Sequence, residues 1–284
     1  AVPMTLGQEF EAFARTLEEE VHAMKVVQNA LRETNMGGTA IGTGLNAPKG
    51  YSQACARHMS RIMKSEIRLA HNLIEATQDT QAFVLYAGVL KATSIKLSKV
   101  CNDLRLLSSG PRAGLYEINL PPKQPGSSIM PGKVNPVIPE VVNQVCYKVI
   151  GNDLTVTLAA EAGQLQLNVM EPVIASCIFE SQMLLTRAAK TLREHCIDGI
   201  TANEDVCRMF VERSIGLVTA LNPIIGYEKS TELAAEALQT GKGIIELIRE
   251  RKMLTEKQIK DVLDPRTMTG QAPVRRATRS KSAK

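Results

Sequence analysis

Tryptophan is absent from the 284 residues, and aromatic residues make up only 4% of them. Nucleic-acid bases would therefore find few rings on which to stack. No apolar run reaches the roughly eighteen residues that a membrane-spanning helix needs, and the first residues lack the charged-then-apolar order of a secretory signal. We therefore expect no nucleic-acid partner and no membrane partner, and we expect the protein to work in the cytoplasm.

Clustered metal ligands are missing as well. None of the cysteines forms a CxxC pair, and the histidines show no ligand spacing. The sequence predicts free thiols, no metal site and no cofactor. The residues concerned are Cys55, Cys101, Cys146, Cys177, Cys196 and Cys207, with His22, His58, His71 and His195.

The net charge of +5 arises largely at the C-terminal end. Basic residues among serine, threonine and alanine predict that 271–284 is a disordered tail and not a nucleic-acid site. The basic residues of the last ten positions are Arg275, Arg276, Arg279, Lys281 and Lys284.

Apolar residues recur every three or four positions over long stretches, which is the period of an amphipathic helix. Four long helices are predicted, from Thr5 to about Leu31, from 80 to 107, from 136 toward 167, and from 172 to about 196. No alternation long enough for a substantial sheet is present. Long apolar stripes require partner helices, so the expected fold is all-α, a long-helix bundle.

After residue 200 the helical patterns become shorter, at about 202–213, 229–239, 243–251 and 255–263. Glycine and Asn-Pro sequences separate them. Capping boxes are expected at Thr5 with Gln8 and at Thr255 with Gln258. We therefore predict a central bundle domain over 1–200, a small C-terminal helical domain over 201–270, and the tail at 271–284.

The segment GSSIMPGKVNP, residues 126–136, lies between two of the long helical patterns. Its glycines allow unusual backbone dihedrals that can direct N–H groups inward, and its prolines restrict it. A serine in such a loop with a nearby lysine can act as a base or nucleophile beside an anion site. The alternative is a simple connection, with Ser127 in a turn, Lys133 in solvent and Asn135 as the N-cap before Pro136.

This segment resembles the signature of the aspartase/fumarase superfamily, whose lyases eliminate ammonia or water to give fumarate. The preceding CNDLRLLSSGPRAGLYEINLP and the following VIPEVVNQVCYKVIGND and EAGQLQLNVMEP resemble the aspartate ammonia-lyases more than the fumarases. The resemblance covers almost the whole chain. It implies an aspartase/fumarase-type bundle and a carbon–nitrogen lyase acting on L-aspartate, fumarate and ammonia. The glycine-rich run at 37–44 matches a connection of the family, where the glycines are expected to allow tight turns and a close approach to a neighbouring segment.

The resemblance also implies roles for particular residues. Ser127 would be the catalytic base, as an oxyanion that removes a proton next to a carboxylate to give an aci-carboxylate carbanion. Backbone N–H groups and positive charge would hold that oxyanion. Substrate would be bound by Ser128, Lys133 and Asn135, and Glu140 would support the site.

Family members carry a further domain before the position that Ala1 matches, so the chain is expected to be a C-terminal portion with little activity alone. The family also implies a homotetramer whose active sites are shared between subunits. Two alternatives remain open: a fumarate hydratase-like lyase, which shares the loop but not its flanks, and a non-catalytic helical fragment or subunit.

Overall fold

The computed structural model describes residues 2–124, 129–130 and 132–270. These residues form eleven α-helices, and their strands are no longer than two residues. The all-α prediction is confirmed. The chain divides into two compact units, Ala14–Thr201 and Ala1–Phe13 together with Ala202–Lys284.

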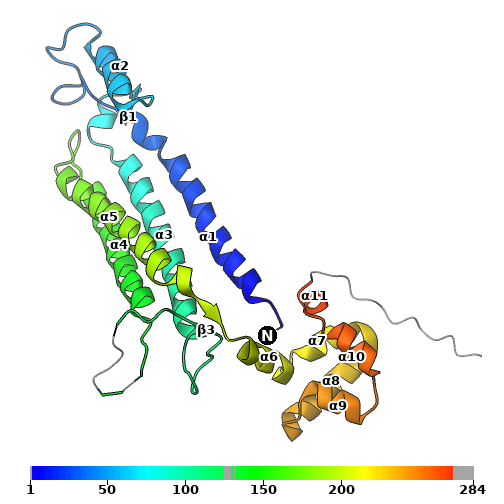
Figure 1. The fold of residues 1–284 in the computed structure, drawn as a ribbon. Coiled ribbons are helices and arrows are strands. Elements are labelled where there is room, and N and C mark those ends of the chain that lie inside the picture. The colour runs from blue at the N-terminus through cyan, green and yellow to red at the C-terminus, as the bar shows by residue number, and fades with distance from the viewer. Residues whose placement is uncertain (1, 125–128, 131, 271–284) are drawn as a thin grey trace, which may run out of the picture. The chain divides into compact units, whose positions relative to one another are not determined.

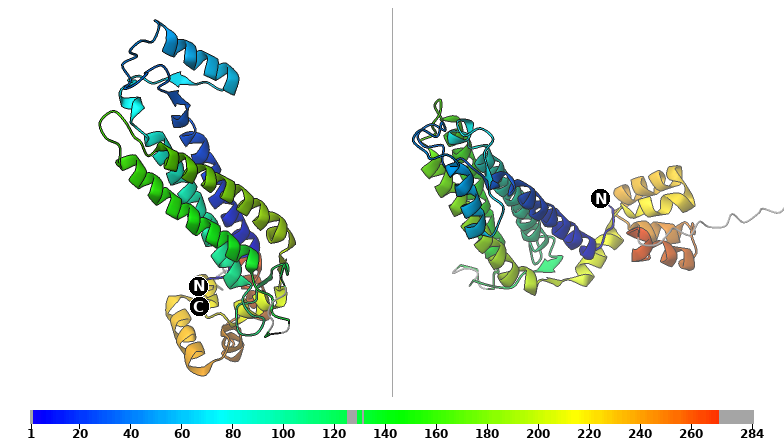
Figure 2. Two further views of the ribbon diagram at one scale, coloured as in Figure 1. Left: turned by 90° about the vertical axis from the view of Figure 1, so that its left-hand side faces the viewer. Right: turned by 90° about the horizontal axis from the view of Figure 1, so that it is seen from above.

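The first unit is built from long antiparallel helices (Figures 1 and 2). They are α1 (Leu6–Val27, which begins in the other unit), α3 (Gln81–Leu107), α4 (Val137–Glu161) and α5 (Glu171–His195). Their lengths of 22, 27, 25 and 25 residues are about twice the usual mean of about 11 to 12. The four long helices predicted from periodicity are therefore present.

The core of this unit lies where α3, α4 and α5 pack together. Apolar residues at helical spacing are buried on the facing sides, because each helix hides one stripe from water. From α3 these include Ala87, Leu90, Leu97, Val100 and Leu104; from α4, Val142, Val149 and Val156; from α5, Ile174, Ile178, Leu185 and Leu192.

Helix α1 is attached to α3 largely by charge. The buried carboxylate of Glu20 lies 2.6 Å from the Nζ atom of Lys96, and Glu19 lies 3.1 Å from the same atom. The hydrogen bond to Glu20, and to a smaller extent the one to Glu19, raises the pKa of Lys96. Of the apolar stripe predicted for this helix, Phe13 is buried and Val21 is exposed, while Leu17 and Met24 are half-buried.

Helix α4 ends six residues before the predicted position near Leu167. The buried Asn168 amide donates to the carbonyl oxygens of Ala159 (3.0 Å) and Ala160 (3.3 Å). It thereby satisfies acceptors that a helix leaves open at its C-terminus. A short hairpin with a bridge between Gln164 and Leu167 then leads into α5. The apolar period continues past Glu161, but the helix does not.

One end of the first unit carries short elements around α2 (Tyr51–Met63), a helix that periodicity did not predict. Only Ala56 of α2 is buried, so it has no broad apolar stripe to detect. Gly42 has a φ of +88°, and a Cβ there would lie 2.3 Å from Ile74 Cα, so the expected tight turn and close approach are confirmed. The elements at this end are η1 (Ala30–Arg32), the parallel pair β1 (Glu33–Thr34) and β2 (Arg68–Leu69), and η2 (Glu75–Thr77).

Near the other end of α3, β3 (Ile118–Asn119) pairs with β4 (Thr201–Ala202), which follows η3 (Ile197–Gly199). The Asn119 side chain donates to Thr201 Oγ1 at 3.1 Å.

The second unit contains short helices around its own apolar core. They are α6 (Glu204–Arg213), α7 (Leu217–Ile225), α8 (Tyr227–Thr240), α9 (Ile244–Glu250), α10 (Glu256–Val262) and α11 (Pro265–Met268). The core includes Leu217, Leu221, Leu233, Ile244, Leu247 and Ile248. The predicted patterns match α6, α8, α9 and α10 within two residues at each end. Helix α7 was not predicted because Asn222-Pro223 was taken as a break, yet Pro223 lies within it.

Both predicted capping boxes are confirmed. Gln8 N donates to Thr5 Oγ1 at 3.1 Å and Thr5 N donates to Gln8 Oε1 at 3.0 Å. Thr255 and Gln258 make the same reciprocal pair at the start of α10. Each box satisfies two backbone groups that a helix start would leave without partners.

All six cysteines are free thiols. Burial raises the pKa of the Cys101 thiol to about 12 and those of Cys146 and Cys196 to about 11. These thiols stay protonated at neutral pH and are poor nucleophiles. Among the residues described, no helix has both the length and the apolar character needed to cross a membrane.

Candidate functional site

The predicted catalytic loop, 126–136, precedes α4. Ser127 and Ser128 lie outside the described residues. Of the remaining predicted residues, Lys133 is exposed, whereas Asn135 and Glu140 are half-buried. All three belong to one short stretch of backbone that leads into and begins α4.

A turn shapes the described part of the loop. Lys133 N donates to Met130 O at 3.2 Å, and Gly132 has a φ of +80°. Residues with a side chain rarely adopt this left-handed conformation, so the glycine suits the position. The turn precedes Lys133, whose ammonium group can serve as a point charge for a carboxylate.

The observed start of α4 does not assign the helix-capping role to Asn135. Helix α4 begins at Val137 with Pro136 as its N-cap, and no side-chain capping bond is present there. The interpretation of Asn135 as the N-cap before Pro136 at N1 is therefore wrong. Val137 N donates to Asn135 O at 2.9 Å, and Glu140 N donates to Pro136 O at 3.1 Å. These backbone bonds hold the end of the loop close to the first turn.

The electrostatic environment of this segment favours an anion. The N-terminus of a helix carries a partial positive charge from its aligned peptide dipoles, and α4 has 25 residues. Lys133 adds a full positive charge four residues before the helix begins. A dicarboxylate could therefore be attracted by both, while the Glu140 carboxylate lies in the first turn, where the dipole stabilises it.

A polar network lies one turn further along α4. Asn143 is 2% exposed, and its side chain bonds to Ser98, Asn102 and Arg105 of α3. Sequence reasoning did not single out Asn143. The available signal was an asparagine on the apolar face of a helical pattern, between Pro139 and Cys146, where a buried amide requires partners.

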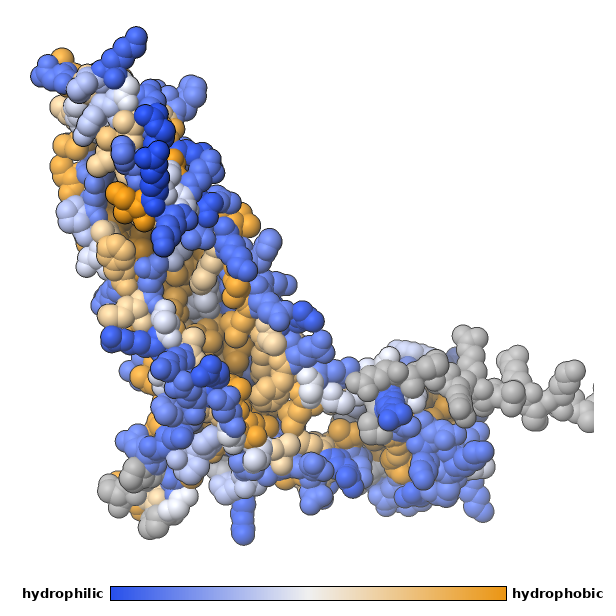
Figure 3. All heavy atoms as spheres, turned by 45° about the horizontal axis from the view of Figure 1, so that its top comes forward, coloured by the Kyte–Doolittle hydropathy of each residue, from blue (hydrophilic) through white to orange (hydrophobic). Residues whose placement is uncertain are grey.

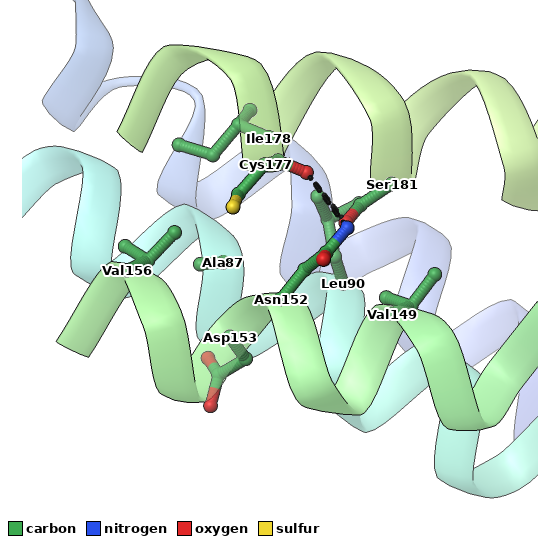
Figure 4. A pocket seen from close by; sticks show the side chains of 9 residues that line it. All are labelled: Ala87, Leu90, Val149, Asn152, Asp153, Val156, Cys177, Ile178 and Ser181. Atoms are coloured by element: carbon green, nitrogen blue, oxygen red, sulfur yellow. Dashed lines mark hydrogen bonds between the residues drawn. The ribbon is translucent and has the colours of Figure 1, made fainter. Parts of the chain in front are cut away.

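A second network joins α4 to α5. The Asn152 amide donates to Cys177 O (3.4 Å), Glu180 Oε2 (2.9 Å) and Ser181 Oγ (3.1 Å). Figure 4 shows the side chains of Asn152 and Ser181 pointing toward each other in the space between the helices. The space has no room for a water molecule. This is helix packing and not a ligand site.

A larger cavity, of about 520 Å³, lies toward the opposite end of α3. It is lined mainly by η1, β1, η2 and the starts of α3 and α5, and its carboxylates are those of Glu33, Glu75, Asp79 and Glu171. The predicted site residues that the structure describes, Lys133, Asn135 and Glu140, do not line it. The 27 residues of α3 span about 40 Å at 1.5 Å per residue, which separates this cavity from the start of α4.

In the described part of the chain, no group of three or more His, Cys, Asp or Glu side chains is arranged to hold a metal ion. The segment before and at the start of α4 carries an amine (Lys133), a primary amide (Asn135) and a carboxylate (Glu140) within eight residues of the chain. The amine and the amide N–H group are donors that can bind a carboxylate.

The chain is similar to curated aspartate ammonia-lyases. The chain is 62% identical to an aspartate ammonia-lyase of Pseudomonas aeruginosa over 269 residues, which are 94% of this chain and 57% of the relative. It is 57% identical to an aspartate ammonia-lyase of Escherichia coli over 262 residues, covering 92% and 55%. The chain thus spans little more than half the length of these relatives.

Solved structures show the same fold. A fumarate lyase:delta crystallin from Brucella melitensis, bound to cobalt, superposes with a TM-score of 0.90 at 55% identity, covering 95% of this chain and 58% of that one. A class II fumarase from Schistosoma mansoni superposes with a TM-score of 0.89 at 33% identity, covering 95% and 59%.

Two family models match separate parts of the chain. The model described as "Lyase" matches residues 1–151, which include the loop and the start of α4, and the model described as "Fumarase C C-terminus" matches 217–270. The first covers more than half of the 284 residues. The chain therefore belongs to the lyase family, within the aspartase/fumarase superfamily that its loop residues resemble.

Proposed function

We propose that the complete protein is an aspartate ammonia-lyase, which eliminates ammonia from L-aspartate to give fumarate and catalyses the reverse addition. The observation that carries this proposal is 57–62% identity to aspartate ammonia-lyases along nearly the whole chain. The class II fumarase is 33% identical, which favours ammonia over water as the leaving group. Lys133 and Asn135 before α4 supply groups that suit a dicarboxylate.

In the proposed mechanism the Ser127 oxyanion removes a proton from the carbon next to the β-carboxylate of aspartate. The electron pair of that C–H bond moves into the carboxylate and gives an aci-carboxylate. Collapse of this intermediate forms the carbon–carbon double bond, breaks the C–N bond and releases ammonia, leaving fumarate. Charge develops on the carboxylate during the first step, so donors directed at it lower the barrier.

The proposed binding groups act on that charge. Lys133 provides a positive charge, Asn135 provides a directed N–H donor, and Ser128 adds a hydroxyl donor. Glu140, in the first turn of α4, supports the site by orienting a polar group. Ser127 with its loop therefore performs the proton transfer, and the residues around the start of α4 hold the substrate.

The substrate assignment can be tested by following fumarate absorbance with the complete protein. L-aspartate should yield fumarate, because a site matched to an ammonium group leaves buried polar groups unpaired when a hydroxyl takes its place. L-malate should yield little. Malate formed from fumarate in ammonia-free buffer, at a rate equal to that of aspartate deamination, would instead identify a fumarate hydratase. A chain limited to residues 1–284 serves as the control and should form little fumarate from aspartate, which would fit a C-terminal portion whose site needs further residues.

We also propose that the protein is a homotetramer with active sites shared between subunits. Apolar side chains on one exposed face of α4 support an assembly, since a helix that exposes such a face usually packs against a partner. Figure 3 shows apolar patches along the long helices of the first unit. The large apolar residues exposed on this face are Tyr147, Leu154 and Leu158, and Val141 is exposed on another side of the helix.

Light scattering of the complete protein at micromolar concentration should give four times the chain mass. A monomeric mass would contradict the assembly, because closed symmetric oligomers of this kind form through interfaces that persist at such concentrations.

We infer that the protein works in a reducing compartment, the cytoplasm. The free thiols in the structure support this, because thiols remain reduced there. Titration of the unfolded protein, purified without reductant, should find all six thiols, and a lower number would contradict the inference.

A further inference from the structure

The side chain of Asn143 connects α4 to one face of α3. Its Nδ2 atom lies 2.8 Å from Ser98 Oγ, 3.1 Å from Ser98 O and 3.1 Å from Asn102 Oδ1. Arg105 Nη1 donates to its Oδ1 atom at 3.2 Å. One buried amide therefore bonds to residues on two successive turns of α3.

The chemistry of these partners determines which way the amide faces. A guanidinium group only donates and a backbone carbonyl only accepts. Oδ1 must therefore face Arg105, and Nδ2 must face the carbonyl of Ser98. A rotated or shifted α4 would leave the buried amide, 2% exposed, without partners, which is costly. Asn143 thus specifies both the axial position and the rotation of α4 against α3.

This constraint acts close to the proposed site. Glu140 lies three residues before Asn143, which places the two on neighbouring turns of the same side of the helix. Backbone bonds from Glu140 N to Pro136 O and from Val137 N to Asn135 O connect the first turn to the end of the loop. A shift of α4 by one residue would move these groups by about 1.5 Å and rotate them by about 100°. Misplacement by about 1 Å can cost about a hundredfold in rate.

We propose that Asn143 is a positioning residue of the lyase reaction: it aligns the start of α4, and through it Lys133, Asn135 and Glu140, with the bound dicarboxylate. The proposal rests on the proposed function, because it assigns those residues to the substrate site. Asn143 does not itself touch the substrate in this account. It acts through the backbone and the first turn of α4.

Asn152 provides a matched control on the same helix. It is 4% exposed, and its amide also bonds to three acceptors of a neighbouring helix, here α5. It lies nine residues beyond Asn143 and so further from the loop. Removing either amide deletes comparable bonds, but only the bonds of Asn143 hold the turn next to Glu140.

The test compares Asn143→Ala with Asn152→Ala in the complete protein. Denaturant unfolding measures stability, aspartate kinetics give kcat and KM, and succinate, a dicarboxylate that does not react, reports ground-state binding. We expect both variants to lose similar stability. Asn143→Ala should lower kcat about ten- to a hundredfold with less than threefold change in KM and succinate affinity, because misalignment acts most on the transition state. Asn152→Ala should keep kcat within about threefold of the starting protein.

Two variants of Arg105 disturb the packing less and test the same network if Asn143→Ala does not fold. Arg105 is exposed, so Arg105→Ala removes one bond to Asn143 without opening a cavity in the core. Arg105→Lys retains a donor. Arg105→Ala should lower kcat and Arg105→Lys should restore most of it, whereas equal activity of the two would contradict the role of this network.

The possible outcomes separate the two proposals. Unchanged kcat in Asn143→Ala, or equal losses in both asparagine variants, would overturn the positioning role while the aspartase assignment stands. Starting protein that hydrates fumarate but does not deaminate aspartate would overturn the proposed substrate, and the same comparison of variants with fumarate would then decide the role of Asn143. Starting protein with neither activity would remove both proposals.

Discussion

Ser127→Ala in the complete protein is expected to lower kcat for aspartate at least about a hundredfold, the scale of a lost proton-transfer group. The carbon acid next to a carboxylate is weak, and no water molecule held in the same place is as basic as a serine oxyanion. Because the serine acts on the proton and not on the carboxylates, KM should change little. Steady-state kinetics with aspartate, followed by fumarate absorbance, measure both constants.

Lys133→Ala is the contrasting variant in the same loop. Its main effect should be a higher KM, with a smaller loss of kcat, because the ammonium group attracts the substrate before reaction and also faces the developing charge. The unfolding temperature of Lys133→Ala should match that of the starting protein, since the lysine is exposed. Near-normal turnover by the serine variant would exclude Ser127 as the base.

Leu247→Ala in the second unit is expected to cost about 2–5 kcal/mol of stability. The Leu247 side chain is 0% exposed within the core formed by α7, α8, α9 and α10, so its loss removes buried apolar area and leaves a cavity. Hydrogen exchange of the amides in α8 and α9 measures the free energy of opening of this unit directly.

Leu238→Ala on α8 is the control for the same change in the same unit. Leu238 is 72% exposed, and its truncation should alter stability by no more than about 0.5 kcal/mol. Equal destabilisation by the two substitutions would contradict the assignment of Leu247, and not Leu238, to the buried core of this unit.

Local patterns in the sequence determined which segments become helices. Stripes of apolar residues predicted α1, α3, α4 and α5 because the α-helix repeats every 3.6 residues wherever it occurs. The capping boxes at Thr5 and Thr255 were predictable for a similar reason, since the bonding partners lie three residues apart. The loop motif and its flanks also indicated the family to which the chain belongs. The roles of the individual residues in that family remain predictions, namely those of Ser127, Ser128, Lys133, Asn135 and Glu140.

Contacts beyond the three- and four-residue spacing of a helix decided the remaining features. The end of α4 at Glu161 depends on Asn168 returning to bind the carbonyls of Ala159 and Ala160. Helix α7 includes Pro223 although the Asn-Pro sequence was taken as a break, and its buried residues Leu217 and Leu221 pack in the core of the second unit. A periodic pattern contains neither kind of information.

The alignment of the site shows the same division most clearly. The sequence by itself determined that α4 is a helix and that Lys133, Asn135 and Glu140 lie before and within its first turn. Only the tertiary structure decided how far α4 is shifted and rotated against α3, through the bonds of Asn143 to Ser98, Asn102 and Arg105. The physical reason is that an apolar stripe tolerates sliding, because burial is not directional, whereas a buried amide is satisfied in one arrangement of its donors and acceptors.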